Sequence, residues 1–484
     1  MIQGGGEFLG LFDRDGTTPL STFNFPDQKQ DVSYGLEADN STEGYFSPPT
    51  PGSANSQSFS GFVADTKFSI SRGFYDTAQN VSITTATPGA TIRYTTNGSE
   101  PSESIGTIYS GPVTINQTTV LRAMAYKEGL APTNIDTNTY LFVDDVITSP
   151  ELGVAVTQQM RDSLTTVPSL SIVTPQTING TSEIPASFEL INPDGTPGFQ
   201  ENCGVKNFGG AFTNFDKKSF RMYFRSQYGA SKLEHPLIEG FDRGITATNT
   251  FDQLNVRSGS HDIVSLFLRF EYRPIVRSML DMGNINPHGR FMHLYLNGKY
   301  WGVYHIGERW SADTLTEYLG GPKEGYEAIN GNWNVGGWAD SVAPAYDGDG
   351  SAWERIKTLG LTSSPQNFED LSPYLDMEHF IDYMIMWMFG NSEDEYRCVG
   401  PADVGSGFKW FLNDADGYLR SAGNRTGFAS NTPGVFGRSA GDGPGSLFSL
   451  LFKAGDPEFR ILLADRIHKH FFNGGALTAE ASVE

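Results

Sequence analysis

The chain has 484 residues, a formal net charge of −22, and 38% hydrophobic and 13% aromatic residues. This length exceeds what a single hydrophobic core usually supports, so we expect two to four domains. The hydrophobic content argues against a disordered chain. The strong negative charge argues against nucleic-acid binding, because phosphate contacts need clustered Lys and Arg.

Cysteine content and apolar runs constrain the setting of the protein. Cys203 and Cys398 are the only cysteines, so one disulfide and two buried thiols remain open alternatives. No apolar run reaches the length of about 18 residues that a membrane-spanning helix needs. The first residues lack the basic start and apolar core of a signal peptide, and we expect the natural chain to extend beyond both ends.

Residues 1–56 are predicted to form β-strands and a linker. Residues 8–12 alternate like a strand, Asp15-Gly16 is a turn signal, and residues 48–55 are rich in Pro, Gly and Ser. The segment resembles the closing half of a lamin-tail domain, an immunoglobulin-like sandwich. The markers of this resemblance are Gly6-Glu7-Phe8, Gln28, Ser33-Tyr34-Gly35, Thr50-Pro51-Gly52 and Asn55. Half a sandwich leaves a sheet edge uncovered, which also favours a start further upstream.

Residues 57–147 show the short, regularly spaced strands of an all-β sandwich. Turns such as Pro88-Gly89 and Asn97-Gly98 separate strands predicted at 81–84, 91–95, 113–115 and 119–126. The strings IRYTTNGSEPS, IYSGPVTI and LRAMAYKEGLAP resemble the small sandwich at the C-termini of chitobiases and hexosaminidases. That module accompanies catalysis in its family. We favour a spacer here over surface glycan contact, because the strands lack an exposed platform of Trp side chains.

The largest segment, residues 148–484, opens with the layout of a nucleotide-binding lobe. A strand predicted at 168–174 is followed by a glycine turn at Gly209-Gly210 and a basic strand over 216–225. Backbone N–H groups can approach phosphates where side chains are absent, and a Lys on the next strand can neutralise them. The alternative is a solvated strand face.

A helix is predicted over residues 263–282, where apolar residues recur at helical spacing apart from an offset at Pro274. A kinase needs a carboxylate on a helix to hold its phosphate-binding Lys. Glu271 is the candidate for that carboxylate.

Residues 289–309 are predicted to form a β-hairpin around Asn297-Gly298, because a tight primed turn needs positive φ at both central positions. In this register apolar and aromatic side chains cover both faces of the ribbon, which is typical of the centre of a sheet. The string -YLNG-x-YWG-x-Y-x-x-x-ER-, with -DMG- before it and -YLGGPKEGYEAI- after it, resembles the spore-coat CotH family of kinase-like proteins. The likeness extends over most of residues 200–478.

The resemblance implies an atypical protein-kinase-like fold that uses ATP and Mg²⁺ and acts on secreted or surface-exposed proteins. The family motif has a glycine turn, a Lys-Lys pair and an alternating basic strand. By that match, Lys217, Lys218 and Arg221 are the candidates for phosphate contact.

An acidic group follows a second helix, predicted over residues 376–389. Glu393 and Asp394 lie in the loop after this helix, and a later strand ends at Asp414 and Asp416. Phosphoryl transfer requires one carboxylate to position the acceptor hydroxyl and another to hold Mg²⁺. By the family match, Asp414 is the first metal ligand, Asp416 the second, and Glu393 or Asp394 the acceptor-positioning group. A solvated acidic loop is the alternative.

The chain departs from the family pattern in this region. Asn413 stands where a Trp usually precedes the metal-binding Asp, and the loop's downstream Asn has no clear counterpart. These departures favour a function from another class, a non-catalytic surface or adhesion protein with a degenerate kinase-like domain. The final helix, predicted to begin near Asp456, matches the family's helical tail and is expected to be structural.

We therefore predict a multidomain chain with N-terminal all-β immunoglobulin-like sandwiches followed by an α+β atypical kinase-like domain. The predicted parts are half a lamin-tail sandwich at 1–56, a small complete sandwich at 57–147, and the kinase-like domain at 148–484. The predicted function is a secreted or surface-associated kinase that phosphorylates protein side chains and has no nucleic-acid partner.

Overall fold

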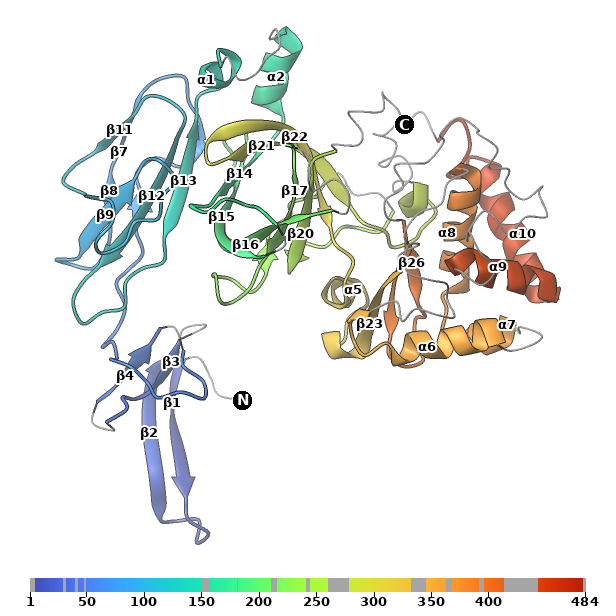
Figure 1. Ribbon diagram of the computed structural model, residues 1–484, viewed down its shortest axis with the longest axis horizontal. Coiled ribbons are helices and arrows are strands. Elements are labelled where there is room, and N and C mark those ends of the chain that lie inside the picture. Colours follow the sequence, from blue (N-terminus) through green and yellow to red (C-terminus); the bar gives the residue numbers. More distant parts are fainter. Residues whose placement is uncertain are drawn as a thin grey trace. The chain divides into compact units, whose positions relative to one another are not determined.

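A computed structural model describes most of the chain (Figure 1). The described residues are 5–28, 32–39, 42–47, 49–149, 157–180, 182–209, 216–240, 244–259, 278–331, 345–362, 368–390, 396–412 and 443–481. The chain divides into two compact units. The first unit is Met1–Lys206 with Met222–Ser231 and Met292–Tyr304, and the second is Asn207–Arg221, Lys232–Phe291 and His305–Glu484.

The N-terminal segment forms two antiparallel ribbons. These are β1 (Gly5–Phe12) with β2 (Pro19–Asp27), and β3 (Ser33–Leu36) with β4 (Glu43–Phe46). The strand predicted at residues 8–12 is confirmed within β1. Phe8 and Leu11 are each more than half exposed, whereas Phe46 at the end of β4 is buried. The lamin-tail assignment of this segment stays a prediction.

The next part is a β-sandwich, in which the strands predicted at 91–95, 113–115 and 119–126 are confirmed, whereas the strand predicted at 81–84 is interrupted at Ser82. Its sheets have the strand orders β10-β9-β12-β13-β6, β11-β7 and β5-β8. The core between them contains Val81, Ile83, Ile115, Leu121 and Tyr140. The strands are β5 (Lys67–Phe68), β6 (Gly73–Phe74), β7 (Gln79–Val81), β8 (Ile83–Thr84), β9 (Thr91–Thr95), β10 (Thr107–Ile108), β11 (Val113–Ile115), β12 (Thr119–Tyr126) and β13 (Asp136–Leu141).

Two short helices, α1 (Val143–Ile147) and α2 (Gln158–Thr166), lead from the sandwich to a barrel. Seven strands close this barrel in the order β14-β15-β16-β17-β20-β22-β21 (Figure 1). They are β14 (Ser169–Val173), β15 (Ile184–Ile191), β16 (Gln200–Phe208), β17 (Ser219–Tyr223), β20 (Gln253–Arg257), β21 (Gly289–Leu296) and β22 (Lys299–Glu308). A small ribbon of β18 (Leu233–Glu234) and β19 (Thr250–Phe251) lies between β17 and β20 in sequence.

The hairpin of β21 and β22 confirms the predicted primed turn. Asn297 and Gly298 have φ values of 49° and 77°, so both central residues adopt the left-handed conformation. The prediction that both faces are covered holds for β21, where Met292 and His293 are both buried. It is wrong at Val303 on β22, which is 40% exposed. The described pairing of β22 with β20 begins two residues later, so Val303 lies beyond it.

The remainder of the second unit contains an antiparallel sheet of order β24-β23-β25-β26 with helices beside it (Figure 1). The strands are β23 (Tyr326–Gly331), β24 (Ala345–Asp347), β25 (Tyr396–Pro401) and β26 (Lys409–Phe411). The helices are α5 (Ala312–Leu319), α6 (Ser351–Lys357), α7 (Phe368–Leu371), α8 (Met377–Gly390), α9 (Gly443–Ala454) and α10 (Pro457–Phe471), with the 3₁₀-helix η4 (Lys323–Gly325) and the π-helix η5 (Thr358–Thr362).

Helix α8 is the central helix of this part, and its predicted range is confirmed. Its apolar residues from Met377 to Trp387 are buried and pack with Trp353 and Trp410, whereas Phe389 in the last turn is 45% exposed. Helix α10 begins where expected, because the Asp456 carboxylate accepts hydrogen bonds from the first free N–H groups of the helix. The helix predicted over residues 263–282 lies largely outside the described residues.

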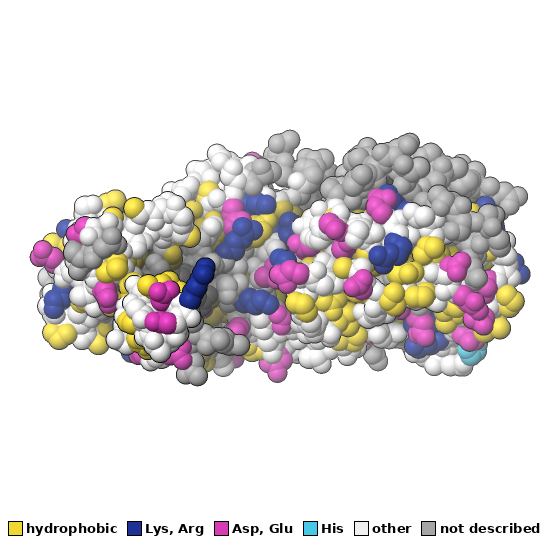
Figure 2. Space-filling view, turned by 90° about the horizontal axis from the view of Figure 1, so that it is seen from below, with side chains coloured by type: hydrophobic (Ala, Val, Ile, Leu, Met, Phe, Trp, Pro, Cys, Tyr) yellow, Lys and Arg dark blue, Asp and Glu magenta, His cyan; other side chains and the backbone are white. Residues whose placement is uncertain are grey.

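Cys203 and Cys398 are both free and buried. Of the two alternatives left open by the sequence, the structure has two buried thiols and no disulfide between them. Burial raises the pKa of each thiol well above its ordinary value. Among the described residues, no helix is both long enough and apolar enough to cross a membrane. On the face shown in Figure 2, Lys and Arg side chains lie among Asp and Glu side chains.

Candidate functional site

Strand β17 carries Arg221, one of the three basic residues predicted to contact phosphate. The Arg221 Nε donates to Asn255 Oδ1 on β20 at 2.9 Å, and the guanidinium lies 4.8 Å from the centre of the Phe208 ring. Two residues earlier, the Ser219 hydroxyl accepts from the Ser258 N–H at 2.9 Å. Side chains thus hold β17 to β20, and Arg221 is a positioned group.

The two predicted lysines lie just before β17 and are both half-buried. Lys217 lies in a bend and Lys218 directly before the first residue of the strand, so strand alternation does not assign either side chain to the face of Arg221. Arg221 is thus the one predicted phosphate contact that lies within the described strand. Gly209 has a φ of 121°, a conformation that favours glycine, and the turn that follows it lies outside the described residues.

The end of the hairpin is held by a buried network around Glu308. Its carboxylate accepts hydrogen bonds from the His288 N–H at 2.7 Å and from the Tyr318 hydroxyl, and it lies 3.0 Å from His288 Nδ1. The other ring nitrogen of His288 lies 2.7 Å from the Ile245 carbonyl oxygen. Both ring nitrogens of His288 thus lie within hydrogen-bonding distance of an oxygen atom. Glu308, the Glu of the -ER- that ends the family string, thus has a structural role.

Arg309, the residue after Glu308, contacts Gln253 and Tyr346, and a cluster of charged residues begins next to Gln253 in the sequence. Arg309 donates to Gln253 and lies over the Tyr346 ring, 5.0 Å from its centre. Next to Gln253, the Asp252 carboxyl is largely buried against Asp313. Burial, and then the negative charge of Asp313, raise the pKa of Asp252 to about 6.

Lys323 partly neutralises this cluster. Its Nζ lies 2.5 Å from an Asp313 oxygen and 3.9 Å from an Asp347 oxygen. Asp347 also accepts from the Ala312 N–H at the start of α5, at 3.0 Å. Sequence reasoning missed this cluster, because its members lie on α5, η4 and β24 and in the bend between β19 and β20, and no local motif joins them.

The predicted acidic residues precede β25 and follow β26 in the sequence. Arg397 on β25 pairs with Phe411 on β26, so β25 begins where β26 ends. On the other side of β25, Tyr396 pairs with Gly331 at the end of β23. The start of β25 and the end of β26 therefore lie at the same end of the sheet.

Buried polar contacts fix α8 against this sheet. The Lys409 Nζ on β26 lies 2.5 Å from the Asp376 carboxylate, which also caps α8 by accepting from the His379 N–H at 3.0 Å. Opposing causes act on Asp376: burial would raise its pKa, but the charge of Lys409 and the hydrogen bonds outweigh burial and lower it. The His379 Nε2 lies 2.9 Å from the Ile285 carbonyl oxygen. The helix that precedes the acidic loop is thus rigidly placed.

A second buried network joins α8 to α10. Asp382 on α8 accepts from Arg466 and from the Asn284 side-chain amide, and His470 Nε2 lies 3.1 Å from it. Arg466 also reaches Glu378, one turn earlier on α8, at 2.7 Å. The predicted structural role of the helical tail is consistent with these contacts. The part played by Asp382 was not found from the sequence, since its partner lies 84 residues away.

Comparison with known families decides the affiliation of the chain. The profile of the CotH kinase protein family matches residues 205–470, more than half of the chain. The chain belongs to the CotH kinase family. The profile of the chitobiase/beta-hexosaminidase C-terminal domain matches residues 70–137, within the sandwich. No curated protein matches the chain.

The CotH affiliation gives the predicted acids their context, although the structure does not test them. Glu271, Glu393, Asp394, Asp414 and Asp416 all lie outside the described residues. Within the described part of the chain, no group of three or more His, Cys, Asp or Glu residues is arranged to hold a metal ion. The family implies nucleotide use, whereas the individual site residues stay predictions.

Proposed function

We propose that this CotH-family protein is an atypical kinase that transfers phosphate from ATP, with Mg²⁺, to side chains of secreted or cell-surface proteins. The family match supports nucleotide use, and the combination of CotH and chitobiase-type domains supports a surface or extracellular setting. In this proposal the β-barrel is the nucleotide-binding lobe. The second lobe, which carries the acids, consists of α8 and the sheet β24-β23-β25-β26.

The observation that carries the proposal is the pairing of Arg397 with Phe411. Asp394 precedes Arg397 by three residues, and Asp414 follows Phe411 by three residues. The two predicted acids thus precede and follow this strand pair by the same number of residues, which supports the proposal that they act together.

The predicted donor set fits a hard divalent cation, because carboxylate oxygens are the protein ligands that Mg²⁺ prefers. Asp414 and Asp416 would hold it, and Glu393 or Asp394 would orient the acceptor hydroxyl. Bound Mg²⁺ would neutralise charge on the phosphate oxygens. Lys217, Lys218 and Arg221, in and just before the basic strand, would contact the phosphates.

The test compares thermal unfolding with and without ATP and Mg²⁺ in the wild type and in Asp414→Ala. Saturation at about one hundred times Kd stabilises the native state by about 2.7 kcal/mol. We expect a clear upward shift for the wild type and none for Asp414→Ala. The matched control is Asp465→Asn, which changes an exposed carboxylate on α10 and should keep the wild-type shift. Phosphate transfer from labelled ATP to an acceptor protein should be lost in Asp414→Ala and kept in Asp465→Asn.

A non-catalytic surface or adhesion role is the second candidate, and Asn413 favours it, because the family usually has Trp there. No shift in either protein would support this role. A shift without phosphate transfer would indicate a nucleotide-binding pseudokinase. A full shift and full transfer in Asp414→Ala would refute the assignment of Asp414.

A further inference from the structure

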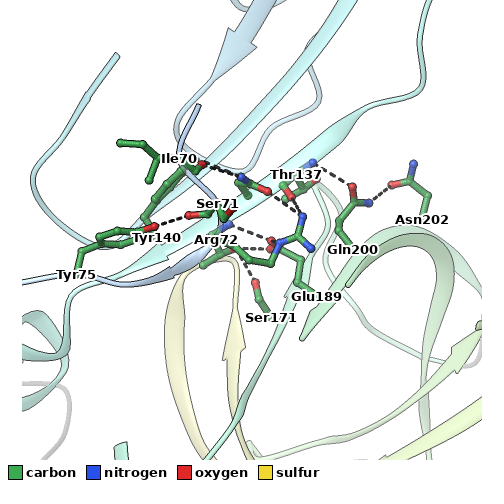
Figure 3. A network of polar contacts seen from close by, with 12 residues as sticks. Ile70, Ser71, Arg72, Tyr75, Thr137, Tyr140, Ser171, Glu189, Gln200 and Asn202 are labelled. Carbon is green, nitrogen blue, oxygen red and sulfur yellow. Dashed lines mark hydrogen bonds and ion pairs between the residues drawn. The ribbon is translucent and has the colours of Figure 1, made fainter. Parts of the chain in front are cut away.

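Glu189 on β15 is a fully buried carboxylate at the junction of the sandwich and the barrel (Figure 3). Arg72, from the sandwich segment between β5 and β6, places its Nε 3.1 Å from Glu189 Oε1. Thr139 on β13 of the sandwich donates both its N–H, at 3.0 Å, and its hydroxyl to the same carboxylate. The charge of a barrel residue is thus compensated by two residues of the sandwich.

Further polar contacts extend this junction along β13. The Thr139 hydroxyl lies 2.8 Å from the Ser171 hydroxyl on β14 of the barrel. The Asn202 amide on β16 donates to the Ile135 carbonyl oxygen at 3.4 Å, and Gln200 on the same strand accepts from the Thr137 N–H (Figure 3). Three strands of the barrel therefore contact the sandwich through specific groups.

An apolar cluster continues the junction beside these polar groups. Leu141, at the end of β13, is buried together with Ile191 of β15 and Tyr295 of β21. Residues of the linking helices, including Val146 and Leu164, complete the cluster. Apolar burial and a compensated charge thus occur in the same interface.

The turn of the central hairpin also lies against the sandwich. A Cβ placed on Gly298 would come within 3.4 Å of Val120 Cγ2, which shows how closely the turn approaches β12. From the sandwich side, a Cβ on Gly98 would lie 3.5 Å from Val173 and 3.7 Å from Asn297. The two predicted Asn-Gly turns, one in each part, thus lie next to each other.

We propose that the barrel carries a docking surface built for the sandwich of the same chain, so that sandwich and barrel fold and open as one unit. Domains joined only by a linker are expected to move relative to each other unless their interface is substantial. A carboxylate buried away from water is costly unless it is paired and hydrogen-bonded. Without the sandwich, Glu189 would lose its cation and two of its donors. The sandwich is therefore a fixed part of the fold here, in contrast to the predicted spacer.

The test uses the full chain and measures hydrogen exchange in two ladders, β12–β13 of the sandwich and β14–β15 of the barrel. Arg72→Met keeps most of the side-chain volume and removes the charge that faces Glu189. We expect at least tenfold faster exchange of the protected amides in both ladders at neutral pH. Faster exchange in one ladder with no change in the other, or wild-type exchange in both, would overturn the proposal.

The double variant Arg72→Met/Glu189→Gln identifies the buried charge as the cause. It removes both charges, and we expect it to recover protection in both ladders. If Arg72→Met alone does not fold, recovery of folding in the double variant supports the proposal, and failure of both variants refutes it. The control is Arg93→Met, whose guanidinium bonds the Gly106 carbonyl within the sandwich and should show no such rescue by Glu189→Gln.

The pH dependence gives an independent readout. Burial raises the pKa of the Glu189 carboxyl, and Arg72 opposes that rise, so loss of Arg72 raises the pKa further. The stability of Arg72→Met should therefore be highest at low pH, where the carboxyl is neutral in both states, and should fall as the pH rises. Arg122 and Tyr140 also interact with Glu189, and Asp136 and Glu201 interact with Arg72. A fall that persists in the double variant would assign the effect to Asp136 or Glu201 and refute the role of Glu189.

Discussion

Glu308 offers a sharp test of how the hairpin is held in the CotH domain. The substitution Glu308→Ala removes the acceptor for the N–H of His288, which is buried, and for the hydroxyl of Tyr318, which is partly buried. A buried donor left without a partner costs about 1–3 kcal/mol, so the His288 N–H alone predicts a loss of about 1–3 kcal/mol. Glu308→Gln keeps one acceptor oxygen and should lose about half as much.

Hydrogen exchange of the β20–β22 ladder is the appropriate assay, because Leu254 pairs directly with Glu308 there. Exchange reports the local opening free energy without assuming that a chain of several parts unfolds in one step. Glu317→Gln is the matched control, since the Glu317–Lys232 ion pair is partly exposed and should be worth less than about 1 kcal/mol. If Glu308→Ala exchanged no faster than Glu317→Gln, the network would not be what holds the hairpin.

Two further predictions concern a titrating carboxyl and a turn. The pKa of Asp252 is raised to about 6, so the wild type should lose stability as the pH rises from about 4 to 6. Asp252→Asn should flatten this decline in a series of melting temperatures measured across that pH range. An unchanged profile would contradict the assignment. Asn297→Ala should cost about 1–2 kcal/mol in denaturant unfolding, because it forces Ala to a φ of 49° and removes the acceptor for the Thr174 N–H; Asn297→Gly should cost less, and equal losses would refute the strain argument.

Local chemistry in the sequence determined the elements themselves. The Asn297-Gly298 pair specifies a primed turn, because few other residues tolerate positive φ at both positions. Apolar residues on all sides predicted a buried α8, and Asp456 predicted the start of α10. The order of basic strand, buried helix and acidic loop also followed from the sequence, and the match to the CotH family agrees with it.

Tertiary structure alone decided which polar groups became buried partners. Glu189 and Glu308 resemble other glutamates in the sequence, yet the pairing of distant strands encloses both with specific donors. The partners of Glu189 and Asp382 lie 50 and 84 residues away, beyond the reach of any local motif. The compensation of a buried charge depends on groups that only chain closure brings together. For the same physical reason the contacts of Arg72 and Thr139 with Glu189, which join sandwich and barrel, could not be predicted from the sequence.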